Sequence, residues 1–283
     1  RNSAPFSFDL VATGSYKQGE AIVITANTSE ASQSGNTITV TLDTTDTVIL
    51  TAASAGTTLV GTYTVGAGDT SAGLTVSSFS IGTVADTVGN AMSSTTLPAA
   101  SSIFGTKTII IDTTAPTGAI TYSAASPYKQ NATATVTATF TEALETTPKI
   151  AISGVSSVSA TNMSGSGTTW TYAYTAPAGN GIDTFAFSVG TDAYGNVVTA
   201  APTSGATVTV DNTSPTISAV TQVVTPGNDT TPSYVFTTNE AGTITTNITE
   251  GFSTSASAAN GNNTVTFNTL GEGRYESKTV TVT

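Results

Sequence analysis

The residues of this sequence that could do chemistry are acids at expected loop positions. Neither His nor Cys occurs among the 283 residues, so Ser-His-Asp and Cys-His nucleophiles are excluded and zinc ligation is not expected. Glu142 and Glu145 could in principle form the carboxylate pair of a glycosidase, but two solvated loop acids explain them better. No glycine-rich phosphate loop with its Lys is present. The sequence therefore predicts a protein that is not an enzyme.

Calcium is the ligand that suits these acids best, because Ca²⁺ binds about six to eight oxygens, many from carboxylates and carbonyls. In a seven-stranded sandwich, the preceding linker, the loop after the second strand and the loop before the last strand lie at one pole. In the middle of the chain these segments hold Asp112, Glu142, and Asp192 with Asn196. We expect these four side chains to converge on a structural Ca²⁺ site. The corresponding candidates in the flanking parts of the chain are Asp211, Asn212 and Glu240, and Glu30, Asp86 and Asn90.

The same acids also have a purely structural interpretation. An Asp in a linker commonly forms an Asx turn, and the pattern D-x-x-G-N is a competent turn without any metal. Its Gly supplies a positive φ, which Asn also tolerates. Both interpretations stay open from the sequence alone. A second pair of acids, Asp69 and Asp183, is expected at the opposite pole and is a weaker candidate.

The elements that must position these acids are predicted by an internal repeat. Ile111–Thr117 (IDTTAPT) is echoed by Val210–Thr216 (VDNTSPT), which places the two aspartates 99 residues apart, and Ser3-Ala4-Pro5 is a partial third copy. Other landmarks recur in the same order: Tyr16-Lys17-Gln18 and Tyr128-Lys129-Gln130, then Tyr63–Asp69 and Tyr174–Asn180, then Asp86–Asn90 and Asp192–Asn196. This order predicts three domains, at residues 1–111, 112–210 and 211–283.

The hydrophobic pattern predicts an all-β fold. From Thr133 to Phe140, threonines alternate with apolar residues, which is typical of an antiparallel strand with one face in water. Helical periodicity is missing, and Gly, Asn, Asp and Pro clusters separate the short runs. Several short strands per repeat indicate tandem immunoglobulin-like antiparallel β-sandwiches. The expected core includes Ile22, Ile24, Val136, Phe140, Phe185 and Phe187.

The third domain is expected to be incomplete. It has 73 residues, 26 fewer than the repeat, and it lacks the D-x-x-G-N loop and the strand that follows it. We expect either that the native chain continues past Thr283 or that another subunit supplies this strand, so that residues 211–283 alone have an open sheet edge or one filled from elsewhere. If neighbouring subunits exchange strands, Phe6–Thr13 is the candidate donor.

Several segments together resemble a known class of repeats. The linkers Ile111–Thr117 and Val210–Thr216, the loops Ala85–Asn90 (ADTVGN) and Thr191–Asn196 (TDAYGN), and the stretch Thr225–Thr245 are similar to the bacterial and archaeal Ig-like (Big-type) repeats of giant surface adhesins and surface-layer proteins. This resemblance covers essentially the whole chain. It implies an extracellular protein at the cell surface, in which such modules serve as stalks, adhesive arms, coats or filament subunits.

The charge and composition narrow the partners. The chain carries 18 acids against 7 bases, with a net charge of -11, so nucleic acid and anionic membrane surfaces are not expected partners. The apolar runs are too short for a membrane-spanning helix. Expected partners are other copies of the chain, neighbouring Ig-like repeats, and surface glycans or proteins. Trp170, the single Trp, is expected to pack in the core and not to form a carbohydrate platform. The alternative function is a pilus-like filament subunit assembled by donor-strand exchange.

Overall fold

The computed structural model describes residues 6–10, 13–225, 227–273 and 275–283. Over these residues the chain is all-β, with one short 3-10 turn at Ala100–Ser102. No helix among them is long and apolar enough to cross a membrane. By its internal contacts the chain divides into two compact units, 1–210 and 211–283. The partial repeat Ser3-Ala4-Pro5 lies outside the described residues.

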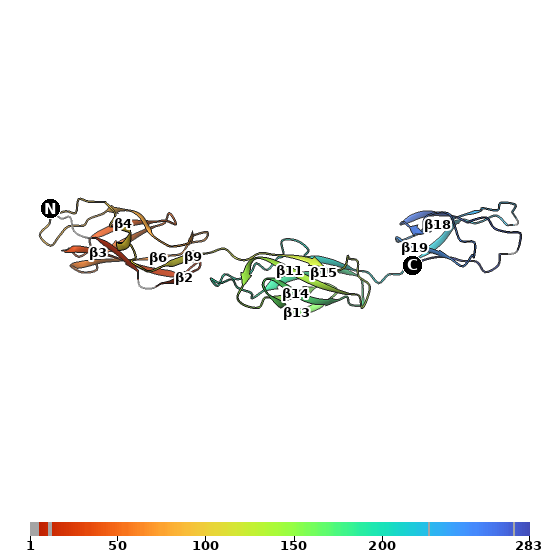
Figure 1. Ribbon diagram of the computed structural model, residues 1–283, viewed down its shortest axis with the longest axis horizontal. Helices are drawn as coiled ribbons and strands as arrows, with labels where there is room; N and C mark the ends of the chain where they lie inside the picture. Colours follow the sequence, from red (N-terminus) through yellow and green to blue (C-terminus); the bar gives the residue numbers. More distant parts are fainter. Residues whose placement is uncertain (1–5, 11–12, 226, 274) are drawn as a thin grey trace. The chain divides into compact units, whose positions relative to one another are not determined.

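The first unit contains the strands of the first two predicted domains (Figure 1). The strands of the first domain are β1 (Ser7–Leu10), β2 (Gly14–Tyr16), β3 (Ala21–Ser32), β4 (Thr37–Leu42), β5 (Thr47–Thr51), β6 (Gly56–Thr64), β7 (Thr70–Ser71), β8 (Val76–Ile81) and β9 (Ile109–Asp112). One sheet runs in the order β1-β3-β6-β5-β4-β8. In the other, β9 lies between β7 and β2 and runs parallel to β2. Asp112 is therefore the last residue of a strand that belongs to the first domain.

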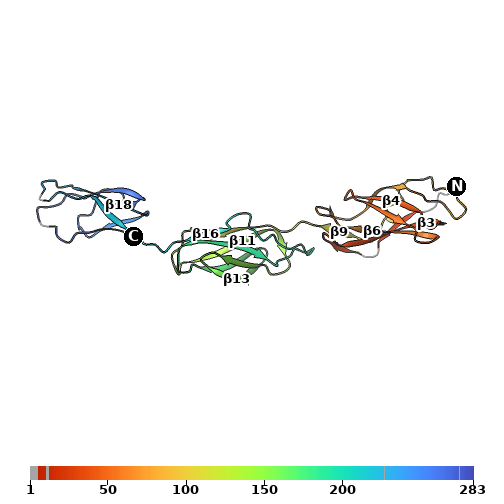
Figure 2. The same cartoon turned by 180° about the vertical axis from the view of Figure 1, so that it is seen from behind.

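The second domain is a seven-stranded sandwich with two sheets. Its strands are β10 (Gly118–Tyr122), β11 (Thr133–Leu144), β12 (Lys149–Ser153), β13 (Ser157–Asn162), β14 (Ser164–Thr175), β15 (Gly181–Ser188) and β16 (Thr207–Val210). One sheet has the order β10-β11-β14 and the other β13-β12-β15-β16, with all these pairings antiparallel. β11 and β13 lie on opposite sides of the domain in both views (Figures 1 and 2). This order is that of an immunoglobulin-like sandwich whose fourth strand joins the sheet of β12.

The period-2 pattern places the core between the sheets. The six residues expected in the core are at most 3% exposed, and they belong to two separate hydrophobic clusters. Trp170 of β14 is also buried, and its indole Nε1 donates to the Gly167 carbonyl at 3.0 Å, so it packs in the core as expected. A third cluster lies within residues 236–282. Each predicted domain thus has a hydrophobic cluster of its own.

The third domain repeats most of this arrangement. Its strands are β17 (Ile217–Thr221), β18 (Ser233–Thr238), β19 (Gly242–Thr246), β20 (Ser257–Ala258), β21 (Gly261–Thr266) and β22 (Val280–Val282). The sheets run β17-β18-β21 and β20-β19-β22. They match β10-β11-β14 and β13-β12-β15, so the described residues provide no counterpart of β16. The described residues of the third domain therefore form six strands, where the second domain has seven.

The structure disfavours Phe6–Thr13 as a strand that is donated to a neighbouring subunit. Residues 7–10 form β1, which pairs with β3 of the same domain over four residues, from Ser7↔Asn27 to Leu10↔Ile24. Phe6, Phe8 and Leu10 are buried in the first hydrophobic cluster. Their hydrophobic burial already stabilises this domain, so donating them to a neighbour would expose its core. Residues 11 and 12 of the segment lie outside the described residues.

Candidate metal centre

Three of the predicted ligands converge in the second domain. Asp112 lies at the end of β9, Glu142 lies near the end of β11, and Asp192 lies in the loop after β15. One carboxylate oxygen from each lies within 4.8 Å of the others. Glu142 belongs to strand β11 itself and not to the loop after it, which corrects its predicted placement by a few residues. The predicted juxtaposition of three separate segments is present.

The loop at 192–196 is fixed by its own hydrogen bonds. Asp192 Oδ1 accepts from the Tyr194 amide at 2.8 Å and from the Asn196 amide at 2.9 Å. A bridge between Thr191 and Val197 closes the loop, and Gly195 has a φ of 86°. Asp192 is only 4% exposed. This carboxylate is therefore held in place by the turn that the D-x-x-G-N pattern predicts.

Asn196 positions the acids through its amide nitrogen. Its Nδ2 donates to Asp192 Oδ2 at 2.9 Å and to the Asp112 carbonyl at 3.0 Å. The side chain thus joins the loop to the end of β9, and it directs a nitrogen to the cluster where the sequence predicted an oxygen ligand. We therefore assign Asn196 as a positioning residue, which corrects its predicted role as a ligand.

Asp112 also makes the Asx turn that the structural interpretation predicts. Its Oδ1 accepts from the Thr114 amide at 2.9 Å. The next residue, Thr113, accepts from the Gly68 amide at 3.1 Å and donates to the Asp69 carbonyl at 3.0 Å through its hydroxyl. The turn and the convergence of acids coexist, because a carboxylate has two oxygens and can accept several hydrogen bonds or ligands.

The electrostatics of the cluster disfavour three charged carboxylates. The pKa of Glu142 is raised above its ordinary value, first by partial burial and then by the charges of Asp112 and Asp192. The described residues contain one salt bridge, Asp9 with Lys107, and it involves none of these acids. A cation of the first domain does reach the loop, because Lys17 Nζ donates to the Gly195 carbonyl at 3.1 Å. Three close carboxylates with hard oxygen donors suit a divalent cation such as Ca²⁺.

Two residues at this site were not predicted from the sequence. Lys17 was noted only as part of a repeated motif, although its side chain touches the 192–196 loop. Tyr194, at the tip of that loop, lines a shallow hollow with Thr70–Ala72 and Ile110–Asp112. The sequence signal that could have indicated Tyr194 is the change from Val88, which holds the same position in the first D-x-x-G-N loop. Val88 itself is 82% exposed.

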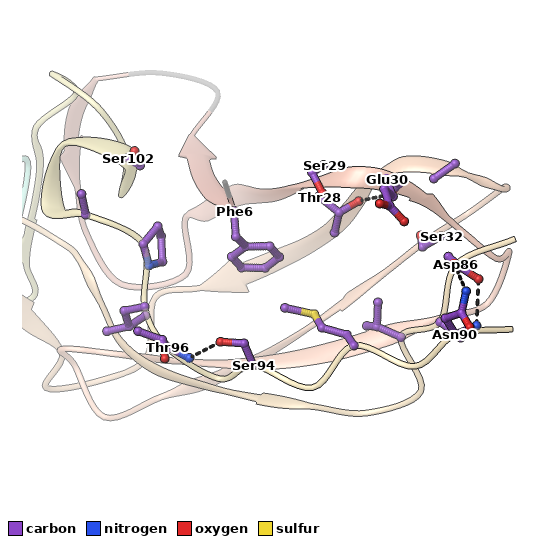
Figure 3. A pocket seen from close by; sticks show the side chains of 17 residues that line it. Phe6, Thr28, Ser29, Glu30, Ser32, Asp86, Asn90, Ser94, Thr96 and Ser102 are labelled. Atoms are coloured by element: carbon purple, nitrogen blue, oxygen red, sulfur yellow. Dashed lines mark hydrogen bonds between the residues drawn. The ribbon is translucent and has the colours of Figure 1, made fainter. Parts of the chain in front are cut away.

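The candidates in the first domain do not form a three-acid group among the described residues. Asp86 Oδ1 accepts from the Val88 and Asn90 amides, and Asp86 Oδ2 accepts from Asn90 Nδ2 at 2.7 Å. Figure 3 shows these two residues and Glu30 around a cavity of about 440 Å³ beside Phe6. In the first domain, therefore, the D-x-x-G-N turn forms although the described residues bring no group of three acids together. The residue that corresponds to Asp112 in the repeat is Arg1, which lies outside the described residues.

Among the described residues, the candidates in the third domain likewise form no group of three acids. Asp211 Oδ1 accepts from the Thr213 amide at 3.0 Å, an Asx turn like that of Asp112. Glu240 Oε1 accepts from Asn239 Nδ2 at 3.2 Å. Asn212 follows Asp211 in the same linker. Residues 211–283 contain no D-x-x-G-N loop, which is the segment that supplies Asp192 in the second domain.

The acids at the other pole are hydrogen-bonded to tyrosines. Asp183 is fully buried and accepts from the Tyr174 hydroxyl at 2.8 Å and the Ser156 amide at 2.6 Å. Asp69 Oδ2 accepts from the Tyr63 hydroxyl and the Gly66 amide, both at 2.5 Å. Burial and these acids raise the pKa of both tyrosines. The acids satisfy buried polar groups, which accounts for their presence without a metal.

Comparison with known proteins adds little to this geometry. No family model matches the chain, and no curated protein matches it. Among the solved structures that match is one described as a marsupial T cell receptor. It has 9% sequence identity and a TM-score of 0.35, over 98% of this chain and 99% of that chain. A likeness of this size carries no argument about function.

Proposed function

We propose that this chain is a non-enzymatic, extracellular protein of the cell surface, in which Ig-like domains form a stalk, arm or coat and Ca²⁺ fixes the junction between the first two. The observation that carries the proposal is the origin of the three acids. Asp112 ends a strand of the first domain, whereas Glu142 and Asp192 belong to the second, and their oxygens lie within 4.8 Å. A cation held by all three would link the two domains.

The chemistry favours a bound cation over three free carboxylates. The charges of Asp112 and Asp192 already raise the pKa of Glu142, so a divalent cation would relieve repulsion that is present without it. Because only the folded chain brings the acids together, bound Ca²⁺ would also stabilise the fold, by about 2.7 kcal/mol when free Ca²⁺ is about 100 times Kd. A ligand shared by two domains favours one relative orientation. Such stiffening suits a structural role.

The experiment is thermal unfolding of the 283-residue chain with Ca²⁺ and with chelator. We expect Ca²⁺ to raise the unfolding temperature of the first unit by several degrees, at roughly 2–4 °C per kcal/mol for a unit of this size. Glu142→Gln should abolish this rise. The matched control is Glu145→Gln, an exposed acid three residues further along that is not part of the cluster and should keep the full rise. An equal rise in both variants, or none in the unmodified chain, would reject the site.

The alternative function, a filament subunit, has one supporting feature and one against it. The edge of β22 is open among the described residues. The proposed donor, however, is already buried in the core of its own domain. We therefore favour the calcium-linked structural module. Surface glycans or proteins remain proposed partners, together with further Ig-like repeats.

A further inference from the structure

A strand near the start of the first domain pairs in parallel with the last strand of that domain. β2 and β9 lie side by side where the chain leaves the domain (Figure 1), over three residues from Gly14↔Ile109 to Tyr16↔Ile111. Every other pair of strands among the described residues is antiparallel. The β2–β9 ladder therefore joins the segment by which the chain enters the domain to the strand by which it leaves.

Two further contacts join the same two segments ahead of this ladder. Phe8 forms a parallel bridge with Ile103, and its carbonyl accepts from the Phe104 amide at 2.8 Å. Lys107 forms the salt bridge with Asp9, with 2.8 Å between Nζ and Oδ1. The first segment of the domain thus follows its last segment in the same direction, and is attached to it at several successive points.

The second domain keeps one position of this pairing. Tyr128 forms a parallel bridge with Val210, and its amide donates to the Thr209 carbonyl at 2.9 Å. In the internal repeat, Tyr128 corresponds to Tyr16 and Val210 corresponds to Ile111. The repeated tyrosine therefore marks the position where the first segment of each domain pairs with the last strand.

The direction of this pairing decides how it responds to tension. When the chain is stretched, β2 is pulled from its N-terminal end and β9 from its C-terminal end. In a parallel pair these ends lie at opposite ends of the ladder, so the strands must slide past one another and the hydrogen bonds of the ladder resist together. A hairpin pulled at its open end loses its hydrogen bonds one at a time. β9 is also held on its other side, where Ile111 pairs with Ser71 of β7.

We propose that β2 and β9 form a mechanical clamp, which keeps the first domain folded while the chain is under tension. Forced unfolding is governed by the rate of unfolding and not by the equilibrium free energy, so such a clamp protects a domain without making it more stable at equilibrium. The inference deepens the proposed function and rests on it, because a stalk or arm at a cell surface bears tension. The clamp itself consists of backbone pairing and needs no Ca²⁺.

The test compares two pulling directions in the 283-residue chain by single-molecule force spectroscopy in chelator. The chain has no Cys, so each introduced pair gives unique handles. Thr13→Cys with Thr114→Cys pulls the two strands from opposite ends of the ladder, whereas Gln18→Cys with Thr114→Cys pulls them apart from the same end. All three positions are exposed. At one loading rate, the first pair should need at least about twofold more force to unfold the domain, because the paired positions must break together.

Two proline variants test whether the β2–β9 hydrogen bonds resist the force. Gly14→Pro removes the amide that donates to the Thr108 carbonyl at 3.2 Å, and a Cβ at this position meets only the Tyr16 ring, at an ordinary 3.6 Å. Ser15→Pro is the matched control, because amides alternate in direction along a strand and that of Ser15 faces away from β9. Gly14→Pro should lower the unfolding force of the first handle pair by roughly a third, as one of the three paired positions is lost. Ser15→Pro should leave this force unchanged.

A core variant separates mechanical resistance from equilibrium stability. Val40 is fully buried in the first hydrophobic cluster, on strand β4 of the other sheet. Val40→Ala should lower the denaturant midpoint of the domain, because it removes buried apolar surface, and should leave the unfolding force of the first handle pair unchanged. A fall in force that follows the loss of stability in this variant would contradict a clamp located at β2 and β9.

Two further results would overturn the proposal. Equal unfolding forces in the two pulling directions would show that the parallel geometry gives no resistance. Equal forces in Gly14→Pro and Ser15→Pro would place the resistance outside the β2–β9 ladder. If Gly14→Pro unfolds the domain, the comparison of the two pulling directions still decides, because it leaves the ladder unchanged. All these measurements are made in chelator, so failure of the clamp is distinguishable from failure of the calcium site.

Discussion

The first and second domains carry the same loop in different surroundings. In both, an Asp accepts from the amides two and four residues ahead and from an Asn side chain. Asp86 is partly exposed, and Val88 at the tip of its loop is exposed. Asp192 is buried, and Asp112 from the preceding domain lies beside it. The difference teaches that the D-x-x-G-N loop forms its turn without a metal. It also teaches that an acid from the preceding linker is needed before the loop can contribute to a metal site.

The surroundings of the two loops also differ in their electrostatics. The pKa of Asp86 is lowered, first by the hydrogen bond from the Asn90 side chain. The pKa of Glu142 is raised, first by burial and then by its two acidic neighbours. The first arrangement is satisfied by neutral donors alone. The second is short of positive charge, which is the condition that a bound cation would change.

The largest effect is expected from removing the buried aspartate. Asp192→Ala leaves the amides of Tyr194 and Asn196 without their acceptor in a buried loop, and should cost about 2–4 kcal/mol of unfolding free energy in chelator. The matched Asp86→Ala should cost clearly less, because water can replace the carboxylate there. Chemical denaturation of both variants measures the difference. Equal losses would show that burial does not distinguish the two loops.

A smaller and opposite effect is expected at Glu142. In chelator, Glu142→Gln removes a partly buried carboxylate next to two others, and should raise stability by about 0.5 kcal/mol. Glu30→Gln is the control at the equivalent place in the first domain and should change nothing measurable. Denaturant midpoints in chelator provide the measurement. Destabilisation by Glu142→Gln would mean that the repulsion is already compensated.

Acidification should act on the two domains with opposite signs. A raised pKa means that folded Glu142 holds its proton more tightly, so its contribution is fully present below the unfolded pKa, near 4.5, and is lost as pH rises through the folded value. The lowered pKa of Asp86 gives a contribution present above about 3.8 and lost as pH falls below it. Carboxyl NMR titrations in chelator, with Glu142→Gln and Asp86→Asn for assignment, test both signs. Shifts in the same direction would contradict the comparison.

The smallest effect is expected from the cation at the second loop. Lys17 Nζ donates to the Gly195 carbonyl, which brings a positive charge to the loop that carries Asp192. Lys17→Met should tighten Ca²⁺ binding by about twofold at low salt, and less at high salt, because partly exposed charges are screened. Calorimetric titration at two ionic strengths measures this change. Weaker binding in the variant would assign Lys17 a positioning role instead.

Much of the fold and the outline of the site follow from the sequence. Period-2 alternation and repeated landmarks predict the sandwiches, and the strand order of a seven-stranded sandwich places Asp112, Glu142 and Asp192 at one pole. Asn196 presents its nitrogen to the acids because that nitrogen donates to both the Asp192 carboxylate and the Asp112 carbonyl, and the sequence pattern does not reveal these two acceptors. The packing of Phe6–Leu10 in its own core likewise depends on side-chain fit across the sheet. Local patterns therefore predict where segments meet, but not every contact they make there.

The most direct measurement is calorimetric titration of Ca²⁺ into the 283-residue chain and into two linker variants, Asp112→Asn and Asp211→Asn. Both variants keep the ability to form an Asx turn, so the turn is not lost with the charge. If Asp112 completes a shared calcium site, Asp112→Asn loses the binding isotherm and Asp211→Asn retains it. Binding that is unchanged in Asp112→Asn, or heat of binding that is absent from the unmodified chain, would contradict a calcium-linked junction.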